Sequence, residues 1–146
     1  MSNHRHMQHE TVDHEDYFTN FMTETLPKAI SAQINCINIG KVTHYDTKRH
    51  LADVQPLPLQ LDNEKTAVVT NALVPASIYV QDDLNAQLAK ANKIKYNKLM
   101  KVGSVVTVGF FDRELDNYHD NNSNYKIESD RMHSLNDPVI LGVIKP

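Results

Sequence analysis

One apolar stretch near residue 105 constrains the fold of this chain more than any other feature. Residues 101–112 read Lys-Val-Gly-Ser-Val-Val-Thr-Val-Gly-Phe-Phe-Asp, a run of β-branched and aromatic residues that favours a buried strand. Gly103 can take the positive φ that a turn requires, and Gly109 inside the run is typical of a bulge or of a tight bend at a barrel corner. A strand this apolar must be covered on both faces. We therefore predict that it is the central strand of a small β-barrel.

The composition is that of a soluble globular protein with one domain. The 146 residues are 40% hydrophobic and 23% charged. No apolar run approaches the roughly 20 residues of a membrane helix, so we predict no membrane anchor. A net charge of −3 argues against a broad basic surface for nucleic acid or anionic lipid. Cys36 is the only cysteine, which excludes an internal disulfide and suits a reducing cytosol, and we expect this side chain to be buried.

The chain begins with a polar segment that is followed by a helical pattern. After Met1, residues 1–15 hold only two aliphatic side chains, Met7 and Val12, too few to form a core, so they are predicted to be a flexible arm. From Asp16 onward, aromatic and aliphatic residues recur at helical spacing. We predict an N-terminal helix over residues 16–28, capped by Asp16 and ended by Pro27.

Residues 29–146 are predicted to form a single domain with five strands. Apolar side chains alternate from Ala29, and the parity of the alternation changes after Cys36, which indicates a bulge in one long strand. Pro56 and Pro58 cannot donate to a sheet, so that end of the second strand should lie at an edge or beyond the sheet. The predicted strands are residues 29–45, 50–61, 66–74, 101–112 and 139–144.

Two further segments lie between the predicted strands. Residues 76–101 carry leucines near helical spacing among good helix formers, and they predict a helix with Asp82 or Asp83 as its N-cap. Residues 113–130 are rich in Asp, Asn, Ser and Tyr and predict a long loop. Five strands with a helix between the third and the fourth are the layout of an OB-fold barrel. The predicted fold class is therefore all-β, a five-stranded OB-fold barrel with an N-terminal helix and a helix between strands three and four.

The residue patterns typical of enzymes do not occur, and we predict no catalytic residue. Residues 9–14, His-Glu-Thr-Val-Asp-His, have one residue too many for the zinc-hydrolase pattern, and the serine after Gly103 lacks a nucleophile elbow. The long loop carries carboxylates that could hold a cation, but they lack the spacing of a calcium loop, so we expect them to be solvated. The loop carboxylates are Asp112, Glu114, Asp116 and Asp120. His133 and Asp137 flank the turn after the loop, and we expect them to hydrogen-bond the loop backbone.

Six blocks of residues occur in an order that carries a resemblance to a known family. They are Gly40-Lys-Val-Thr-His-Tyr-Asp46, Ala52-Asp-Val-Gln-Pro56, Val74-Pro75, Lys101-Val-Gly-Ser-Val-Val106, Phe111-Asp-Arg-Glu-Leu-Asp116 and His133-Ser-Leu-Asn-Asp-Pro-Val-Ile-Leu-Gly142. In order and content they resemble the N-terminal OB domain of tailed-phage membrane-puncturing spike proteins, found at the baseplate hub. The resemblance covers about residues 35–146. Its most specific blocks are residues 112–116 and 133–137, on either side of the long loop.

The resemblance implies a structural protein of the virion tail baseplate, assembled in the cytoplasm of a bacterial host. Such a protein would be a trimer that closes the end of the tail tube, with other baseplate, hub or spike proteins as partners. In the spike proteins a β-helical needle follows the OB domain, whereas this sequence reaches Pro146 without one. We therefore expect the needle to be a separate protein, or the chain to be a short hub adaptor. Residues 76–100 and the N-terminal helix also differ from the family's shorter members and could contact other baseplate proteins.

A single-stranded nucleic-acid-binding protein is the alternative interpretation. OB barrels bind single strands through aromatic and basic residues on strands two and three. Residues 50–75 contain no Phe, Tyr or Trp, and Lys65 is their only lysine or arginine. The surface on which bases stack is therefore missing from these strands, and we prefer the baseplate interpretation.

The histidine-rich arm contains two candidate metal ligands, His4 and His6. His4 and His6 would lie on the same side of an extended strand, and three copies would gather six imidazoles, enough for an octahedral site. The resembling spike proteins bind iron through such a pair, but at their C-terminal tip. We therefore predict no cofactor, with iron at His4 and His6 as the alternative.

Overall fold

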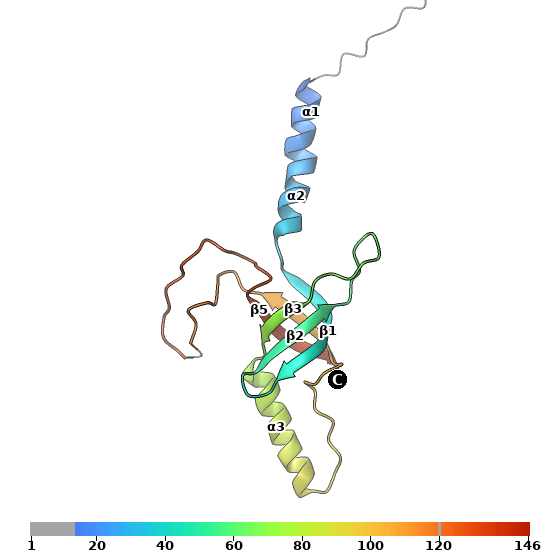
Figure 1. Ribbon diagram of the computed structural model, residues 1–146, viewed down its shortest axis with the longest axis vertical. Coiled ribbons are helices and arrows are strands. Elements are labelled where there is room, and N and C mark those ends of the chain that lie inside the picture. Colours follow the sequence, from blue (N-terminus) through green and yellow to red (C-terminus); the bar gives the residue numbers. More distant parts are fainter. Residues whose placement is uncertain (1–13, 120) are drawn as a thin grey trace, which may run out of the picture. The chain divides into compact units, whose positions relative to one another are not determined.

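The computed structural model describes residues 14–119 and 121–146, with side chains from residue 16 onward within these ranges (Figure 1). The chain divides into two units, Met1–Gln33 and Ile34–Pro146. The first unit contains a helix, and the second contains a β-barrel. Within the described ranges, no helix is both long enough and apolar enough to span a membrane.

The helix of the first unit continues through Pro27, so the prediction that this proline ends it is wrong. Its successive parts are α1 (His14–Asn20), a π-helical turn (Phe21–Thr25) and α2 (Leu26–Gln33). A proline ring lacks an N–H and clashes with the carbonyl four residues back. Here the π turn widens the helix just before Pro27, because the Leu26 N–H donates to the Phe21 carbonyl. The wider turn accommodates the proline.

Residues 29–33, predicted to begin the first strand, belong to α2 instead. The apolar alternation there is ambiguous, because Leu26, Ile30 and Ile34 also recur every four residues, as on one side of a helix. The alanines and glutamine of this segment are good helix formers. Cys36 then lies between α2 and the first strand and is exposed, not buried as expected.

The second unit is a closed five-stranded barrel in the order β1-β2-β3-β5-β4, consistent with an OB-fold. The strands are β1 (Ile37–Asp46), β2 (Leu51–Pro56), β3 (Val69–Leu73), β4 (Val105–Phe110) and β5 (Pro138–Lys145). Neighbouring strands are antiparallel except β3 and β5, which run parallel where Leu73 pairs with Val139. The helix α3 (Ala76–Ala91) lies between β3 and β4 in the sequence. The predicted fold class is confirmed.

Strand β1 pairs along both of its edges and so joins β2 to β4. Residues 37–41 pair with β4, and residues 40–46 pair with β2. The predicted bulge exists, but the register shifts between Val42 and His44 and not after Cys36. A bulge bends a strand and increases its twist. One bent strand therefore serves both halves of the barrel.

The core is filled mainly by small β-branched side chains. In β4, Val106 and Val108 are buried, whereas Val105 and Thr107 on the outer face are half-buried. Cover on both faces of this strand was expected, but it is complete only inside the barrel, where alternate residues point inward. The core cluster comprises Val42, Ala52, Val54, Val69, Ala72, Val74, Ile78, Met100, Val106, Val108 and Ile140.

Helix α3 begins at Ala76, so neither Asp82 nor Asp83 caps it, and it ends at Ala91 instead of near residue 101. Its N-cap is Pro75, with φ −70° and ψ 152°. A proline at this point has no N–H to leave unpaired, and its fixed φ suits entry into a helix. Asp82 lies in the middle of the helix and is buried.

Gly40 permits the close approach of β1 to β2. A Cβ atom on this residue would overlap Val54 Cγ1 and would lie 2.9 Å from the Gln55 carbonyl oxygen. Gly142 of β5 offers a contrast, because a Cβ atom there would have no other atom within 4 Å. Gly40 and Gly142 therefore differ in what an added methyl group would displace.

We predict that Gly40→Ala lowers the free energy of unfolding by about 1–3 kcal/mol, the usual effect of overpacking a core. Gly142→Ala should change it by less than about 1 kcal/mol, because the space is open. Chemical denaturation followed by far-ultraviolet circular dichroism measures both variants. Equal stability of the two would contradict the role given to Gly40.

Candidate functional site

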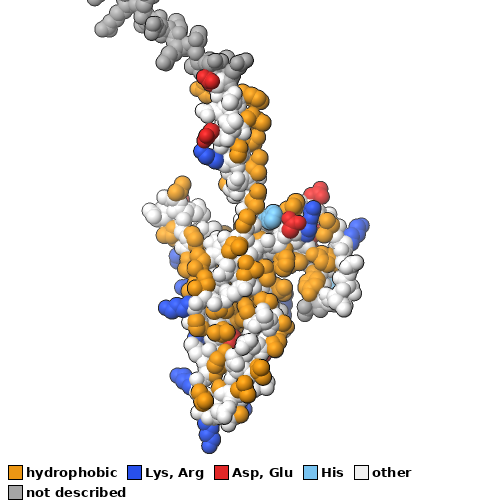
Figure 2. All heavy atoms as spheres, turned by 180° about the vertical axis from the view of Figure 1, so that it is seen from behind, with side chains coloured by type: hydrophobic (Ala, Val, Ile, Leu, Met, Phe, Trp, Pro, Cys, Tyr) orange, Lys and Arg blue, Asp and Glu red, His pale blue; other side chains and the backbone are white. Residues whose placement is uncertain are grey.

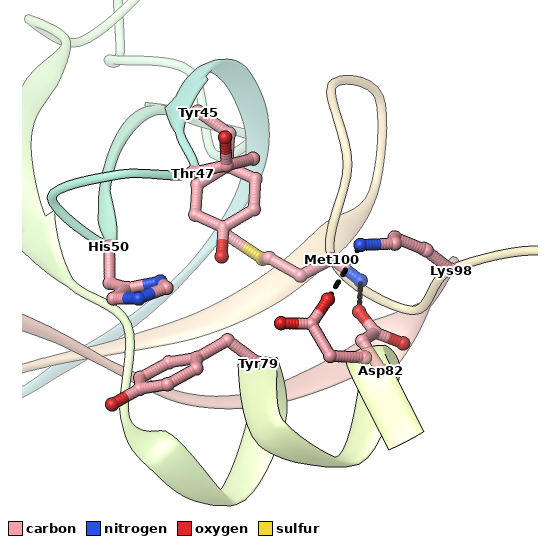
Figure 3. Close-up of a pocket in the computed structure, with 8 residues that line it drawn as sticks. Tyr45, Thr47, His50, Tyr79, Asp82, Lys98 and Met100 are labelled. Atoms are coloured by element: carbon pink, nitrogen blue, oxygen red, sulfur yellow. Dashed lines mark hydrogen bonds and ion pairs between the residues drawn. The ribbon is translucent and has the colours of Figure 1, made fainter. Parts of the chain in front are cut away.

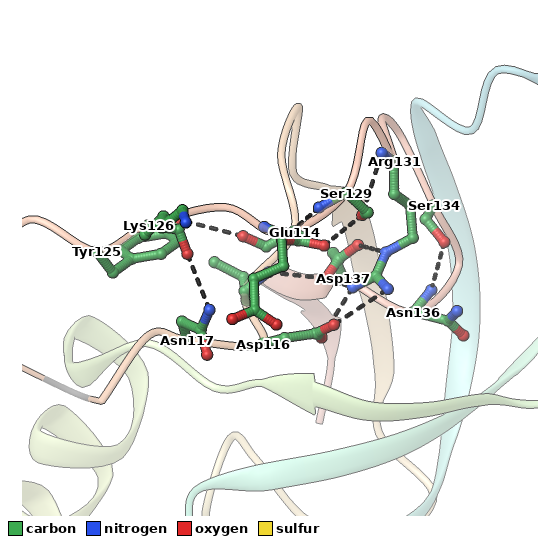
Figure 4. Close-up of polar contacts among 12 residues, drawn as sticks. Glu114, Asp116, Asn117, Tyr125, Lys126, Ser129, Arg131, Ser134, Asn136 and Asp137 are labelled. Carbon is green, nitrogen blue, oxygen red and sulfur yellow. Dashed lines mark hydrogen bonds and ion pairs between the residues drawn. The ribbon is translucent and has the colours of Figure 1, made fainter.

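The long loop between β4 and β5 contains no helix or strand in its described residues, 111–119 and 121–137, as predicted. A set of polar side chains fixes its conformation (Figure 4). We call this set the loop clamp. It consists of Glu114, Asp116, Ser129, Arg131 and Asp137.

Arg131 lies between two carboxylates of the loop clamp. Its Nε and Nη2 donate to the two oxygens of Asp137, each at 2.8 Å, and its Nη1 and Nη2 donate to Asp116 at 3.2 and 2.8 Å. Asp137 and then Asp116 raise the Arg131 pKa above its ordinary value. Asp137 is 1% exposed and also accepts from the Leu115 N–H at 2.9 Å, which confirms that it hydrogen-bonds the loop backbone. Two bidentate contacts fix the plane of the guanidinium.

Glu114 fixes the later part of the loop, at residues 128 and 129. It is 2% exposed, and its carboxylate accepts from the backbone N–H groups of Glu128 and Ser129 and from the Ser129 hydroxyl. The Ser129 hydroxyl makes the largest contribution to a lowered Glu114 pKa, followed by the Glu128 N–H. These hydrogen bonds favour the charged carboxylate. The expectation that the loop carboxylates are solvated is therefore wrong for Glu114.

The remaining polar residues of the loop have other positions. The exposed Asp112 carboxylate contacts the His133 imidazole, with 3.2 Å between Oδ1 and Nε2. We expected this imidazole to bond the loop backbone, so that expectation is wrong. The His133 carbonyl accepts instead from the Asn35 side chain at 2.9 Å. Asp120 lies outside the described residues.

A third buried carboxylate, Asp82 of α3, holds the irregular segment that precedes β4 (Figure 3). It is 2% exposed. Its Oδ1 accepts from the Leu99 N–H and the Tyr96 hydroxyl, and its Oδ2 accepts from the Met100 N–H, each at 2.8 Å. Asp82, which was expected to cap α3, therefore attaches residues 96–100 to this helix instead.

The His50 and Tyr79 rings stack beside Asp82, with centroids 3.6 Å apart and 8° between the planes. His50 has a φ of 53°, and its buried Nδ1 has no hydrogen-bond partner among the described residues. The adjoining cavity has a volume of about 30 Å³, which suits a water-sized molecule and not a substrate. Burial and then the charge of Asp82 raise the pKa of Tyr45, which also lines this cavity.

Two adjoining hollows form a cleft between the strands β2 and β3 and the long loop, and we call it the β2–β3 cleft. Their volumes are about 500 and 390 Å³, within the range of ligand-binding pockets. They share Arg49, Leu51, Leu73 and Tyr118. Tyr79 adds a second tyrosine ring from α3. Neither ring belongs to strand two or three, because α3 supplies Tyr79 and the long loop supplies Tyr118.

The candidate metal ligands His4 and His6 lie outside the described residues. Within residues 14–119 and 121–146, no three His, Cys, Asp or Glu side chains lie close enough together to hold a metal ion. The chain matches no protein-family model and no curated protein sequence. Function is therefore inferred from the loop clamp, the β2–β3 cleft and the exposed surfaces.

We predict that Asp82→Ala lowers the free energy of unfolding by about 1–3 kcal/mol, because it leaves the N–H groups of half-buried Leu99 and buried Met100 without their acceptor. The matched control is Asp83→Ala, which removes an exposed ion pair to Lys98 worth at most about 1 kcal/mol. Urea denaturation measures both. Similar losses in the two variants would contradict the anchoring role of Asp82.

The lowered Glu114 pKa makes stability depend on pH. Its contribution to folding is fully present above the ordinary glutamate pKa of 4.5 and is lost as the pH falls through the lower pKa of the folded chain. We predict that Glu114→Gln is less stable than the native chain near neutral pH and that this difference shrinks below 4.5. Urea denaturation from about pH 7 to about pH 3 measures the difference.

Glu64→Gln, on an exposed hairpin, is the control for this experiment. Its difference from the native chain should stay small over the same pH range. A Glu114→Gln difference that does not vary with pH would show that the carboxylate charge plays no part in holding the loop.

Proposed function

We propose that this chain is a structural component of a phage tail baseplate hub or central spike complex. It would be an OB-fold adaptor that closes the end of the tail tube without catalysing a reaction. The loop clamp carries the proposal, because the two most specific blocks of the resemblance, residues 112–116 and 133–137, meet there. Arg131 joins Asp116 of the first block to Asp137 of the second. Their shared contacts give a physical reason for the two blocks to occur together.

Exposed apolar side chains on both units support a role in assembly. Phe18, Met22 and Ile30 of the first unit are exposed at helical spacing, and Figure 2 shows apolar side chains along one side of this helix. On the barrel, exposed Ile37 pairs in register with Gly109, and the exposed Leu141 side chain lies over the same glycine. Contiguous exposed apolar surface is typical of protein–protein contacts.

A homo-oligomer with rotational symmetry suits this role. A ring of identical subunits can close the end of a tube, and the resemblance favours three copies. The N-terminal helix and residues 76–100 are the proposed contacts with other baseplate, hub or spike proteins. The proposed location is the virion tail baseplate, after assembly in the cytoplasm of a bacterial host, with no cofactor and no direct membrane anchor.

A single-stranded nucleic-acid-binding protein is the second candidate, because the β2–β3 cleft contains the rings of Tyr79 and Tyr118. Bases stack on such rings, but the phosphate backbone also requires a basic path. Arg49 is the only lysine or arginine among the residues that line the two hollows, and the chain carries a net charge of −3. Salt-sensitive retardation of labelled oligothymidylate in a gel would favour this candidate over the baseplate adaptor.

We predict that the purified full chain self-associates, with a trimer as the expected state in light scattering coupled to size-exclusion chromatography. Mass spectrometry should find its peptides in purified virions from cells that carry its gene. Antibodies against it should label the tail end distal to the head. A chain that stays monomeric at all concentrations and does not occur in the virions would rule the proposal out.

A further inference from the structure

Helix α3 and the segment that follows it form a finger that extends beyond the barrel. The first turn of the helix is attached to the core through buried Ile78, and Asp82 binds residues 99–100 of the returning segment. None of residues 83–98 is buried. Figure 1 shows this part of α3 leading away from the strands and the following segment running back. We call residues 83–101 the α3 finger.

Hydrogen bonds fix the end of the finger. The chain reverses just after α3, at Lys93, whose φ is 53°. The Ile94 N–H then donates to the Ala89 carbonyl at 2.8 Å, and the Asn92 side chain donates to the Leu88 carbonyl at 2.8 Å. These bonds bring Ile94 back against the last turn of the helix. The end of the finger therefore presents a defined set of side chains.

Aliphatic side chains are exposed at this end. Leu88 and Ile94 are 54% and 65% exposed, and they line the same hollow, which has a volume of about 330 Å³. Leu84 lies one turn earlier on the same side of α3 and is exposed as well. Exposed apolar surface in one place favours contact with an apolar phase or with a partner.

The charge of the finger is opposite in sign to that of the whole chain. The finger contains five lysines and a single acidic residue, Asp83, whereas the chain carries a net charge of −3. Asp83 is paired with Lys98, with 2.8 Å between Oδ1 and Nζ. On the face shown in Figure 2, basic side chains lie at the end of this unit. The lysines without an ion pair to any described residue are Lys90, Lys93, Lys95 and Lys101.

This combination fits the surface of an anionic membrane. Segments that bind such surfaces place aliphatic side chains at the level of the headgroups and lysine ammonium groups at the lipid phosphates. Lys95 lines the hollow beside Leu88 and Ile94, so a cation adjoins the apolar surface. Single-stranded nucleic acid would instead require stacking platforms, and Tyr96 is the only aromatic residue of the finger. The observations therefore favour lipid.

We propose that the end of the α3 finger binds the surface of a membrane that contains anionic phospholipids. Leu88 and Ile94 would enter the headgroup region, and Lys90, Lys93 and Lys95 would meet the phosphate groups. The contact is peripheral and requires no helix that spans the bilayer. It goes beyond the proposed function, which assigns this segment only contacts with other proteins, and it does not depend on the oligomeric state.

Cosedimentation of the full chain with vesicles tests the proposal. The chain should bind vesicles of phosphatidylglycerol and phosphatidylcholine in equal parts at least about tenfold more tightly than vesicles of phosphatidylcholine alone. Raising the salt concentration from about 50 to about 500 mM should weaken the binding at least about tenfold, because salt screens the attraction between lysines and phosphates.

A triple variant with Lys90, Lys93 and Lys95 each changed to Glu tests the charge. It should bind the anionic vesicles at least about tenfold more weakly than the native chain. A control with the same net charge should lose less than about threefold, and circular dichroism establishes that both variants are folded. The control carries Lys→Glu changes at three exposed lysines outside the finger, Lys48, Lys65 and Lys126.

A tryptophan probe tests the insertion of the aliphatic side chains. The chain contains no tryptophan, so Ile94→Trp provides a single fluorophore at the end of the finger. Its emission should shift to shorter wavelength when anionic vesicles are added, because the indole ring enters the interface. Leu61→Trp, at a fully exposed position of the connection between β2 and β3, should show no shift.

Four results would overturn the inference. Failure of the native chain to bind anionic vesicles at low salt would reject it, as would equal losses in the two triple variants. Binding of labelled oligothymidylate more tightly than vesicles, with the same dependence on the three lysines, would assign the finger to nucleic acid. Binding of polyglutamate as tightly as vesicles, without a shift in the Ile94→Trp emission on vesicles, would assign it to an acidic polypeptide.

The inference and the proposed function fail separately. Vesicle binding by a chain that does not occur in virions would reject the baseplate proposal and support the lipid contact. A trimeric chain that occurs in virions and ignores anionic vesicles would do the reverse.

Discussion

The barrel unit depends on Arg131, which compensates the buried negative charge of Asp137 next to the pairing of β3 with β5. Asp137 precedes β5, and its carbonyl accepts from the Phe111 N–H at 3.0 Å, so it joins the two ends of the long loop. Two residues later, Val139 forms the parallel pairing with Leu73 that closes the barrel. A carboxylate buried there without partners would be strongly destabilising. Because the bidentate contact with Arg131 offsets that cost, ordering of the loop and closure of the barrel depend on each other.

Buried carboxylates hold two irregular segments of the barrel unit in the same way. Glu114 accepts from the N–H groups of residues 128 and 129, and Asp82 accepts from those of residues 99 and 100. Backbone N–H groups outside regular structure need partners when they are buried, and one carboxylate can satisfy several of them. Long connections can therefore keep a fixed conformation without forming a helix or a strand. Connections of this kind can present fixed surfaces to other chains.

The barrel could be predicted because patterns between near neighbours in the sequence specify it. The valine-rich run of residues 105–110 predicted a buried strand, which β4 is on its inner face. The second strand is shorter than the predicted range 50–61, because β2 ends at Pro56 and the residues after it lie beyond the strand, one of the two expected positions. Local patterns failed where backbone geometry overrode them, as at Pro27, which a π turn accommodates. The candidate site was predicted only in part. Asp137 could be assigned from its place beside a turn, whereas Glu114 has its partners about 15 residues away, beyond the reach of any periodic pattern.

By itself, the sequence determined the order of the strands and helices and the place of the long loop, but not the boundary between the first helix and the first strand, where residues 29–33 are helical. Residue preference and periodicity act between neighbours along the chain, so they can be read without a structure. Only the tertiary structure decided which distant side chains meet, such as Arg131 with Asp116, or Arg49 with Tyr118 at one cleft. These meetings follow from the way the barrel closes. Closure is a cooperative result of packing across the whole domain, and no single segment of the sequence records it.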